Sequence, residues 1–330
     1  MEKRKLGKSG IEISPMGLGC WAIGGNMFLQ GMPLGWSKVD DNESLKALQR
    51  GIELGVNFID TADMYGTGHS ERLVALATKG IRDKVVIATK FGITFRPDSG
   101  KINDMEGDAS PEYIRKAVED SLWRMQTDYI DLYQLHLAGY PLDKAQQTRD
   151  TLEDLVKEGK IKSYGWSTDD TERAAFFAEG ENCAAIQQIL NVFVGNTDIL
   201  HLCEQKNLAS INRGPLAMGL LTGKFSLDNK LPKDDVRSIL HNFGDEYHIF
   251  FSEGKPVKEL LDKVDAIREI LKSGGRTLAQ GALAWLWARS KNTIPIPGFK
   301  TVKQVEENAG ALQFGPLTSE QMKEIDTILK

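Results

Sequence analysis

The sequence predicts a closed (β/α)8 barrel of the TIM type with a short β-hairpin in front of it. Short apolar segments with strand character alternate along the chain with segments whose apolar residues recur at three-and-four spacing, as in amphipathic helices. We count eight such strand–helix units, and eight units suit a closed parallel barrel better than an open sheet. The 330 residues show no compositional break and no tandem repeat, so we expect one barrel domain spanning residues 1–330.

The hairpin and the strands are expected as follows. Residues 3–6 and 11–14 flank the turn sequence GKSG and predict the hairpin. The eight barrel strands are predicted at residues 15–19, 57–60, 85–89, 129–134, 161–166, 185–189, 208–211 and 293–296.

Helix signals fill the intervals between these strands. Ser110, Pro111 and Glu112 place an N-cap, a first-turn proline and an acidic residue in order, and Gly159 ends a helix just before a strand. Helices are predicted at residues 43–54, 71–77, 111–125, 145–158, 171–179, 198–205, 257–271, 278–288 and 319–329.

Three longer segments interrupt the rhythm, at residues 21–41, 92–109 and 224–256. The first two directly follow strands, so they belong at the end of the barrel where the C-terminal ends of the strands lie. Long loops at that end are usually lids or substrate walls. We therefore expect the functional site there.

Composition excludes several classes of protein. A net charge of −5 at pH 7 argues against a nucleic-acid surface, which needs a concentrated basic face. The three cysteines are far apart and show no CxxC spacing, which fits a reducing compartment rather than a disulfide framework or a zinc site. No apolar run is long enough to span a membrane, and the start MEKRKLGKSG has no apolar stretch typical of a signal peptide. We predict a cytoplasmic protein.

Ionisable residues stand at the ends of three consecutive predicted strands. Asp60 ends the second strand, Lys90 the third and His136 the fourth, while Tyr65 lies in the loop after Asp60 within VNFIDTADMYG. Neighbouring strands lie about 4.8 Å apart, so these side chains can converge. Read alone, Asp60 and Tyr65 could equally cap a turn and pack a loop.

The four residues together have an electrostatic logic. A free phenol has a pKa of about 10, which is too high for easy proton exchange at neutral pH. We expect the Lys90 ammonium to lower the pKa of Tyr65, and Asp60 to keep Lys90 charged and in place. His136 can orient a carbonyl oxygen by donating a hydrogen bond. This set can protonate a developing alkoxide, as carbonyl reduction requires, without a metal or a protein nucleophile.

FIDTADMYG, then ATK, then YQLH, in this order along eight β/α units, resembles the aldo-keto reductase superfamily. The resemblance extends to IPGFKTVKQVEEN near the end of the chain, and it is greatest to bacterial long-chain oxidoreductases related to potassium-channel β subunits. It implies that Asp60, Tyr65, Lys90 and His136 form the catalytic tetrad, with Tyr65 as general acid in reduction. It also implies NADPH as cofactor and a small carbonyl compound as substrate.

The resemblance further implies where the cofactor binds. Ser167 and Gln187 match residues that hold the nicotinamide carboxamide, although Thr168 replaces an expected asparagine. Leu190 stands where many members place a stacking tyrosine. RGPLAMGLLTGKF matches a loop over the pyrophosphate, and the segment from Gly298 matches the adenosine-phosphate end. Lys300 and Thr301 suit a 2′-phosphate and favour NADPH over NADH. The predicted cofactor contacts are Trp21, Ser167, Thr168, Gln187, Arg213, Gly214, Pro215, Leu216, Gly219, Leu221, Gly223, Lys224, Gly298, Lys300, Thr301, Gln304, Glu307 and Asn308.

Several alternatives stay open at this point. GLGCWA satisfies a dinucleotide-binding pattern, but no helix follows it. No HExxH or clustered ligand spacing predicts a metal. Trp21, Met64, Phe91 and Phe95 can line a substrate pocket or simply pack in the core. The chain could instead be an NADPH-binding redox sensor or auxiliary barrel with slow turnover, or a barrel hydrolase or isomerase acting on phosphorylated substrates. The particular substrate, the reaction direction and the oligomeric state are not predicted.

Overall fold

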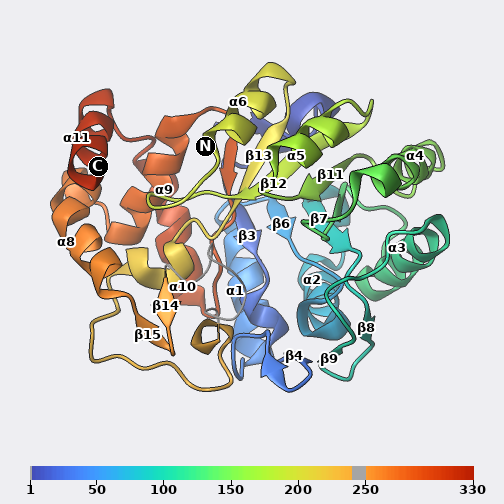
Figure 1. Cartoon of the computed structure of the whole chain (residues 1–330), viewed down its shortest axis with the longest axis horizontal. Coiled ribbons are helices and arrows are strands. Elements are labelled where there is room, and N and C mark those ends of the chain that lie inside the picture. The colour runs from blue at the N-terminus through green and yellow to red at the C-terminus, as the bar shows by residue number, and fades with distance from the viewer. Residues whose placement is uncertain (1, 240–249) are drawn as a thin grey trace.

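Eight parallel strands form a barrel surrounded by helices in the computed structural model, which describes residues 2–239 and 250–330 (Figure 1). Each strand lies where a strand is predicted, with boundaries shifted by a few residues. The barrel strands are β3 (Gly17–Gly19), β6 (Phe58–Asp60), β7 (Val86–Phe91), β10 (Leu132–Leu135), β11 (Tyr164–Ser167), β12 (Cys183–Ile189), β13 (Ala209–Arg213) and β16 (Thr293–Pro295).

The strands follow one another around the barrel in chain order, each pairing in parallel with the next. The first and last strands approach through a parallel bridge between Gly19 and Gly298, and the Gly19 N–H donates to the Pro297 carbonyl at 3.1 Å. A Cβ at Gly19 would lie 2.5 Å from the Ile296 carbonyl oxygen, so only glycine permits this approach. The predicted barrel is therefore confirmed.

The helices between the strands bury one face against the barrel. Helix α3 shows why the sequence forms them: Ser110 accepts a hydrogen bond from the Tyr113 N–H, Pro111 occupies the first turn, and Ile114 and Val118 are fully buried. The helices are α1 (Asp41–Glu53), α2 (His69–Thr78), α3 (Pro111–Met125), α4 (Leu142–Lys157), α5 (Thr171–Ala178), α6 (Thr197–Gln205), α8 (Lys258–Lys272), α9 (Leu278–Arg289), α10 (Val302–Gly310) and α11 (Ser319–Leu329).

The predicted hairpin, β1 (Arg4–Lys5) with β2 (Glu12–Ile13), closes the end of the barrel from which the strands start. Leu6 and Ile13 have no exposed surface and pack in one apolar cluster with inward-facing strand residues such as Phe58 and Leu132. One end of the barrel is thus filled by apolar side chains, and the other end remains for the site.

The long loops form a rim at that other end. The segments after β3 and β7 contribute β4 (Phe28–Leu29), β5 (Met32–Pro33), β8 (Phe95–Arg96) and β9 (Lys101–Ile102), which pair as a small four-stranded sheet. The third long segment, 224–256, includes residues 240–249, which lie outside the described residues, and the strands β14 (Phe251–Ser252) and β15 (Lys255–Pro256). It is joined to the first by an antiparallel bridge between Trp36 and Asp235 and by the Val236 N–H donating to the Gly35 carbonyl at 2.7 Å.

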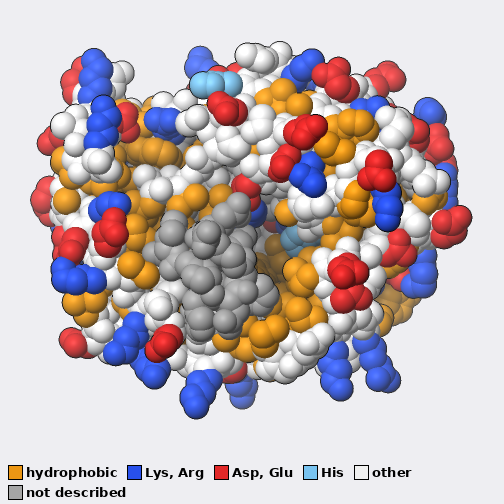
Figure 2. All heavy atoms as spheres, viewed as in Figure 1, with side chains coloured by type: hydrophobic (Ala, Val, Ile, Leu, Met, Phe, Trp, Pro, Cys, Tyr) orange, Lys and Arg blue, Asp and Glu red, His pale blue; other side chains and the backbone are white. Residues whose placement is uncertain are grey.

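Within residues 2–239 and 250–330, no helix has the length and apolar character needed to cross a membrane. On the face shown in Figure 2, acidic and basic side chains are interspersed, and hydrophobic side chains gather beside a hollow near its centre.

Candidate active site

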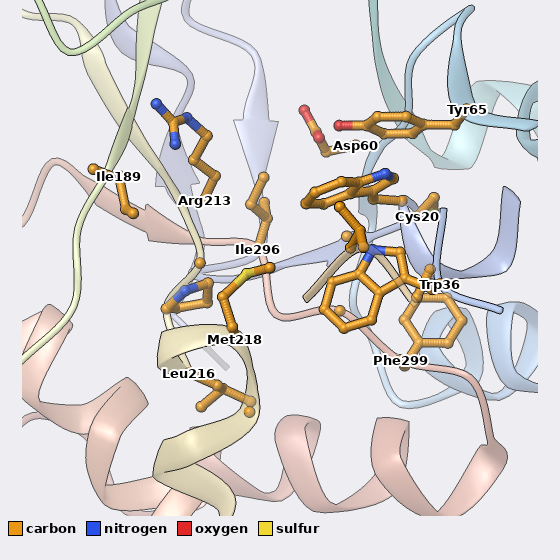
Figure 3. Close-up of a pocket in the computed structure, with 18 of the residues that line it drawn as sticks. Cys20, Trp36, Asp60, Tyr65, Ile189, Arg213, Leu216, Met218, Ile296 and Phe299 are labelled. Atoms are coloured by element: carbon orange, nitrogen blue, oxygen red, sulfur yellow. The ribbon is translucent and has the colours of Figure 1, made fainter. Parts of the chain in front are cut away.

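A cavity of about 670 Å³ opens at the C-terminal ends of the barrel strands, beneath the rim loops. Asp60, Tyr65 and His136 line one part of it, and Lys224 and Lys300 line another. Figure 3 shows Tyr65 and Asp60 on one side of the cavity with Arg213 across from them, and Leu216 and Met218 below Arg213. Three of the four predicted catalytic residues and most of the predicted cofactor contacts therefore share one cavity, and Lys90 is buried behind Asp60 and Tyr65.

The predicted tetrad is assembled around a buried ion pair. Lys90 Nζ lies 2.6 Å from Asp60 Oδ1, with side chains 0% and 2% exposed. Lys90 Nζ also donates to the Thr61 carbonyl at 2.8 Å and lies 3.5 Å from the Tyr65 hydroxyl. The rings of Tyr65 and His136 meet edge to face at 5.9 Å. The hydroxyl of Tyr65 is therefore held next to a fixed cation.

The alternation of side chains along the strands explains why these groups point inward. Phe58, Ala88, Leu132 and Ala185 belong to the apolar cluster inside the barrel. Because strand side chains repeat every two residues, the next inward residue on each strand lies one layer nearer the cavity. These inward residues are Asp60, Lys90, Gln134 and Gln187. A polar layer thus sits on an apolar one.

Two glutamines complete the coordination of the buried carboxylate. Gln187 Nε2 donates to Asp60 Oδ2 at 2.9 Å, and Gln134 Nε2 donates to the same oxygen at 3.2 Å. Gln187 Nε2 also lies 3.1 Å from Gln134 Oε1. Gln187 was predicted as a cofactor contact, whereas Gln134, although part of the YQLH motif, was not singled out. Asp60 is thereby satisfied on both oxygens, which a buried carboxylate requires.

Burial and charge set the protonation of the central pair. Burial acts to lower the pKa of Lys90, but Asp60 and Tyr65 together raise that pKa above its ordinary value, so Lys90 is an ammonium. Burial raises the pKa of Tyr65, and Lys90 only partly opposes this rise. The expected lowering of the Tyr65 pKa is therefore wrong as a net result, because burial outweighs the cation. Tyr65 carries its proton at neutral pH, as a proton donor must.

His136 is held as a neutral imidazole. Burial lowers its pKa well below the ordinary value, and the charges of Lys90 and Arg213 lower it further. Its backbone N–H donates to the Phe91 carbonyl at 2.8 Å, while Nδ1 is buried and finds no hydrogen-bond partner among the described residues. A neutral ring can donate one hydrogen bond to an oxygen in the cavity without adding charge.

The depressed pKa of His136 predicts a pH-dependent stability. Below about pH 6.5 this histidine is protonated in the unfolded chain but stays neutral in the folded protein. The free energy of unfolding should therefore fall as the pH drops below about 6.5, by at most ~1.4 kcal/mol per pH unit from this group. Urea unfolding between pH 5 and 8 measures it. His136→Gln should lack this component, so parallel pH profiles for the two proteins would contradict the assignment.

Three cations converge at the other part of the cavity. Burial lowers the pKa of Lys224, and the neighbouring charges of Arg237 and Lys300 lower it further. Burial likewise lowers the pKa of Lys300, whose ammonium donates to the Trp36 carbonyl. Arg237 is paired with Asp235 at 2.7 Å and lies 4.6 Å over the Trp36 ring. Mutually repelling, partly desolvated cations are a suitable place for a phosphate.

Most of the predicted cofactor contacts line this cavity. Those that do are Trp21, Ser167, Gln187, Arg213, Gly214, Pro215, Leu216, Gly219, Lys224, Gly298, Lys300, Gln304, Glu307 and Asn308. Those that do not are Thr168, Leu221, Gly223 and Thr301. Thr168 donates its hydroxyl to the Ala138 carbonyl, and Thr301 caps α10, so both side chains have structural partners instead.

The apolar side chains considered for the pocket divide between the cavity and the core. Leu190 is 2% exposed and does not line the cavity, whereas its neighbour Ile189 does. Trp21 and Met64 line the cavity, but Phe91 stacks on Tyr133 at 4.6 Å inside the core, and Phe95 is absent from the lining. Because adjacent strand residues face opposite sides, a shift of one residue decides which side chain reaches the cavity.

Among the lining and supporting residues that sequence reasoning missed, three bear on the aromatic wall and the charges of the site. Trp36 packs edge-on against Trp21 at 5.4 Å, and Arg237 lies between Trp36 and the rim strand β14. Asp169 forms an ion pair with Arg213 and accepts a hydrogen bond from the Ile189 N–H at 2.7 Å. Trp36 and Arg237 come from the long segments 21–41 and 224–256, in which no motif was found, whereas the position of Asp169 next to Ser167 and Thr168 was a usable signal.

Comparison with known proteins decides the family. A sequence profile described as the aldo/keto reductase family matches residues 15–330. The chain belongs to the aldo/keto reductase family. It is 32% identical over 336 residues to the aldo-keto reductase YhdN of Bacillus subtilis (strain 168), covering 100% of this chain and 94% of that protein.

Two solved structures extend the comparison. The glycerol dehydrogenase AKR11B4 from Gluconobacter oxydans matches with a TM-score of 0.80 and 32% identity, covering 99% of this chain and 94% of that one. An aldo-keto reductase from Klebsiella pneumoniae in complex with NADPH matches with a TM-score of 0.71 and 27% identity, covering 100% and 96%. The NADPH in the second of these structures is bound by the Klebsiella pneumoniae protein.

The residues of the cavity fit such a cofactor. One part offers Asp60, Tyr65 and His136, and the buried Nδ1 of His136 lacks a partner among the described residues. The other part offers Lys224 and Lys300, two partly buried cations whose pKa values are lowered by burial and by the charge of Arg237. Within residues 2–239 and 250–330, no cluster of His, Cys, Asp and Glu side chains has the arrangement of a metal site.

Proposed function

We propose that this aldo-keto reductase reduces aldehydes or ketones to alcohols by direct hydride transfer, with Tyr65 as general acid. The position of the Tyr65 hydroxyl supports this most directly: it lies 3.5 Å from the buried Lys90 ammonium and lines the same cavity as the phosphate-suited cations. A proton donor and a site for a nicotinamide cofactor thus meet in one cavity.

The reaction follows from these groups. NADPH supplies a hydride to the carbonyl carbon when it is bound. Tyr65 and His136 orient the carbonyl oxygen, and the Tyr65 proton passes to that oxygen as the C=O π bond breaks and a C–H and an O–H bond form. The phenolate left on Tyr65 is stabilised by Lys90 and regains a proton from water. Asp60, held by Gln134 and Gln187, keeps Lys90 in place.

The walls of the cavity support a substrate of apolar character. Trp21, Met64, Ile93, Met105 and Leu137 line it near the tetrad. Trp21 stacks on Tyr65 with ring centroids 6.1 Å apart, so it shields the reacting oxygen from bulk water. We infer that the substrate is a small carbonyl compound with an alkyl or aryl substituent.

The single-domain organisation and the cytoplasmic location stay predictions.

Transfer of a label tests this proposal. NADPH carrying deuterium at C4 of the transferring face, mixed with the protein and a panel of aromatic and aliphatic aldehydes, should give alcohols with deuterium on the carbinol carbon. Mass spectrometry of the product measures it. Bound NADPH that is oxidised negligibly by every aldehyde would contradict the proposal and support a redox sensor or auxiliary barrel. Deuterium lost to water would exclude direct transfer.

A further inference from the structure

Arg213 places a positive charge beside the reacting end of the cavity. It is the last residue of β13 and lines the cavity across from Tyr65 and Asp60 (Figure 3). Its charge contributes to lowering the pKa of both Tyr65 and His136, so its field reaches the atoms that orient the carbonyl oxygen. The proposed hydride transfer makes no chemical use of this cation.

The hydride donor must lie within this field. For reaction, the carbon that gives the hydride must come within about 3–3.5 Å of the carbonyl carbon, whose oxygen is held by Tyr65 and His136. A bound nicotinamide ring would therefore lie in the space that Tyr65 and His136 share with Arg213. This placement rests on the function proposed above.

The two redox states of the cofactor differ in charge at that ring. The reduced nicotinamide ring is neutral, whereas the oxidised ring carries one positive charge, and the rest of the molecule is the same in both states. A guanidinium close to the ring repels only the oxidised form. The interaction of Arg213 with the cofactor phosphates is the same in both states, so it cancels when the affinities for NADPH and NADP⁺ are compared.

Among the described residues, the tetrad carries no net charge. Asp60 and Lys90 neutralise one another at 2.6 Å, His136 is neutral and Tyr65 is protonated. Asp169 pairs with Arg213 and offsets part of its charge, but Arg213 lines the cavity and Asp169 does not. The cationic member of this ion pair is thus the one that faces the ring.

We propose that Arg213 sets which redox form of the cofactor the cavity prefers: it weakens binding of NADP⁺ relative to NADPH and thereby favours uptake of the reduced cofactor and release of the oxidised one. The negative charge of Asp169 reduces this effect of Arg213 on the two affinities. Arg213 acts here on the affinity ratio of the two cofactor forms, not on proton transfer.

Two substitutions with opposite expected signs test the proposal. Arg213→Met keeps an unbranched side chain without charge and should lower the ratio of NADPH to NADP⁺ affinity by about tenfold, the order expected for two unit charges several ångströms apart in a partly buried site. Asp169→Asn keeps an oxygen for the Ile189 N–H and should raise the ratio several-fold. Arg213→Lys is the matched control and should stay within about twofold of the parent protein. Dissociation constants of both cofactor forms follow from quenching of tryptophan fluorescence, because Trp21 and Trp36 line the cavity.

The outcomes separate this inference from the proposed function. If Arg213→Met weakens both forms equally, Arg213 anchors the phosphates and the inference is wrong. If both substitutions move the ratio in the same direction, the effect is structural and the inference is again wrong. If the parent protein binds neither form, the proposed function itself fails. An unchanged ratio with intact binding overturns only the role of Arg213.

Discussion

Replacing Tyr65 with phenylalanine is expected to lower kcat for carbonyl reduction by about 10²–10⁴-fold, the range that a positioned general acid contributes. The substitution removes one hydroxyl from a ring that is otherwise packed between Trp21 and His136, so the fold should not change. Burial keeps this phenol protonated. Among the described groups in contact with Lys90 Nζ, Tyr65 is the one that carries a hydroxyl proton. Steady-state NADPH oxidation measures the loss.

Cofactor binding provides the control for Tyr65→Phe. The NADPH dissociation constant should stay close to that of the parent protein, because the phosphate-suited cations Lys224 and Lys300 are untouched. Turnover within a few-fold of the parent would remove Tyr65 from its role as acid. Loss of turnover together with loss of NADPH binding would point instead to a disturbed cavity.

Replacing Lys90 with methionine is expected to abolish turnover and to destabilise the protein by about 3–5 kcal/mol, because the carboxylate of Asp60 is left buried without its cation. Asp60 keeps only the amide donors of Gln134 and Gln187, and the Thr61 carbonyl loses its charged donor. Urea unfolding followed by circular dichroism gives the free energy, and NADPH oxidation gives the turnover.

The double variant Lys90→Met with Asp60→Asn separates stability from chemistry. Neutralising the carboxylate should recover a large part of the lost free energy of unfolding, because the uncompensated charge has gone. It should not recover turnover, since Tyr65 then has no cation beside it to stabilise its phenolate. A single variant as stable as the parent would contradict the buried ion pair, and an active double variant would contradict the role of Lys90.

The strands and the tetrad could be predicted because they depend on local patterns. Apolar segments predicted all eight strands, and side-chain alternation carries Asp60 and Lys90 to the same inner layer as Gln134 and Gln187. The motif around Tyr65 placed its hydroxyl at the mouth. The cap of α3 at Ser110 was equally local and was confirmed.

Other features could not be predicted because a single residue's phase or partner decides them. Ile189 reaches the cavity in place of Leu190. Phe91 packs on Tyr133 in the core, although it directly follows Lys90 in the sequence. Thr168 and Thr301 satisfy neighbouring backbone groups rather than the cavity. A pattern of residue types contains no information on these choices.

The sequence by itself determined the barrel and the order of its units, since short-range periodicity and turn chemistry encode both, and its strand ends placed Asp60, Tyr65, Lys90 and His136 at one end of the barrel. Only the tertiary structure decided the charges that act there. Burial keeps Tyr65 protonated although Lys90 acts to lower its pKa, and Arg213 at the end of β13 pairs with Asp169 in the loop after β11. Ionisable side chains lose water and form ion pairs only when segments that are distant in the chain come together around one cavity. Their pKa values therefore depend on the folded structure.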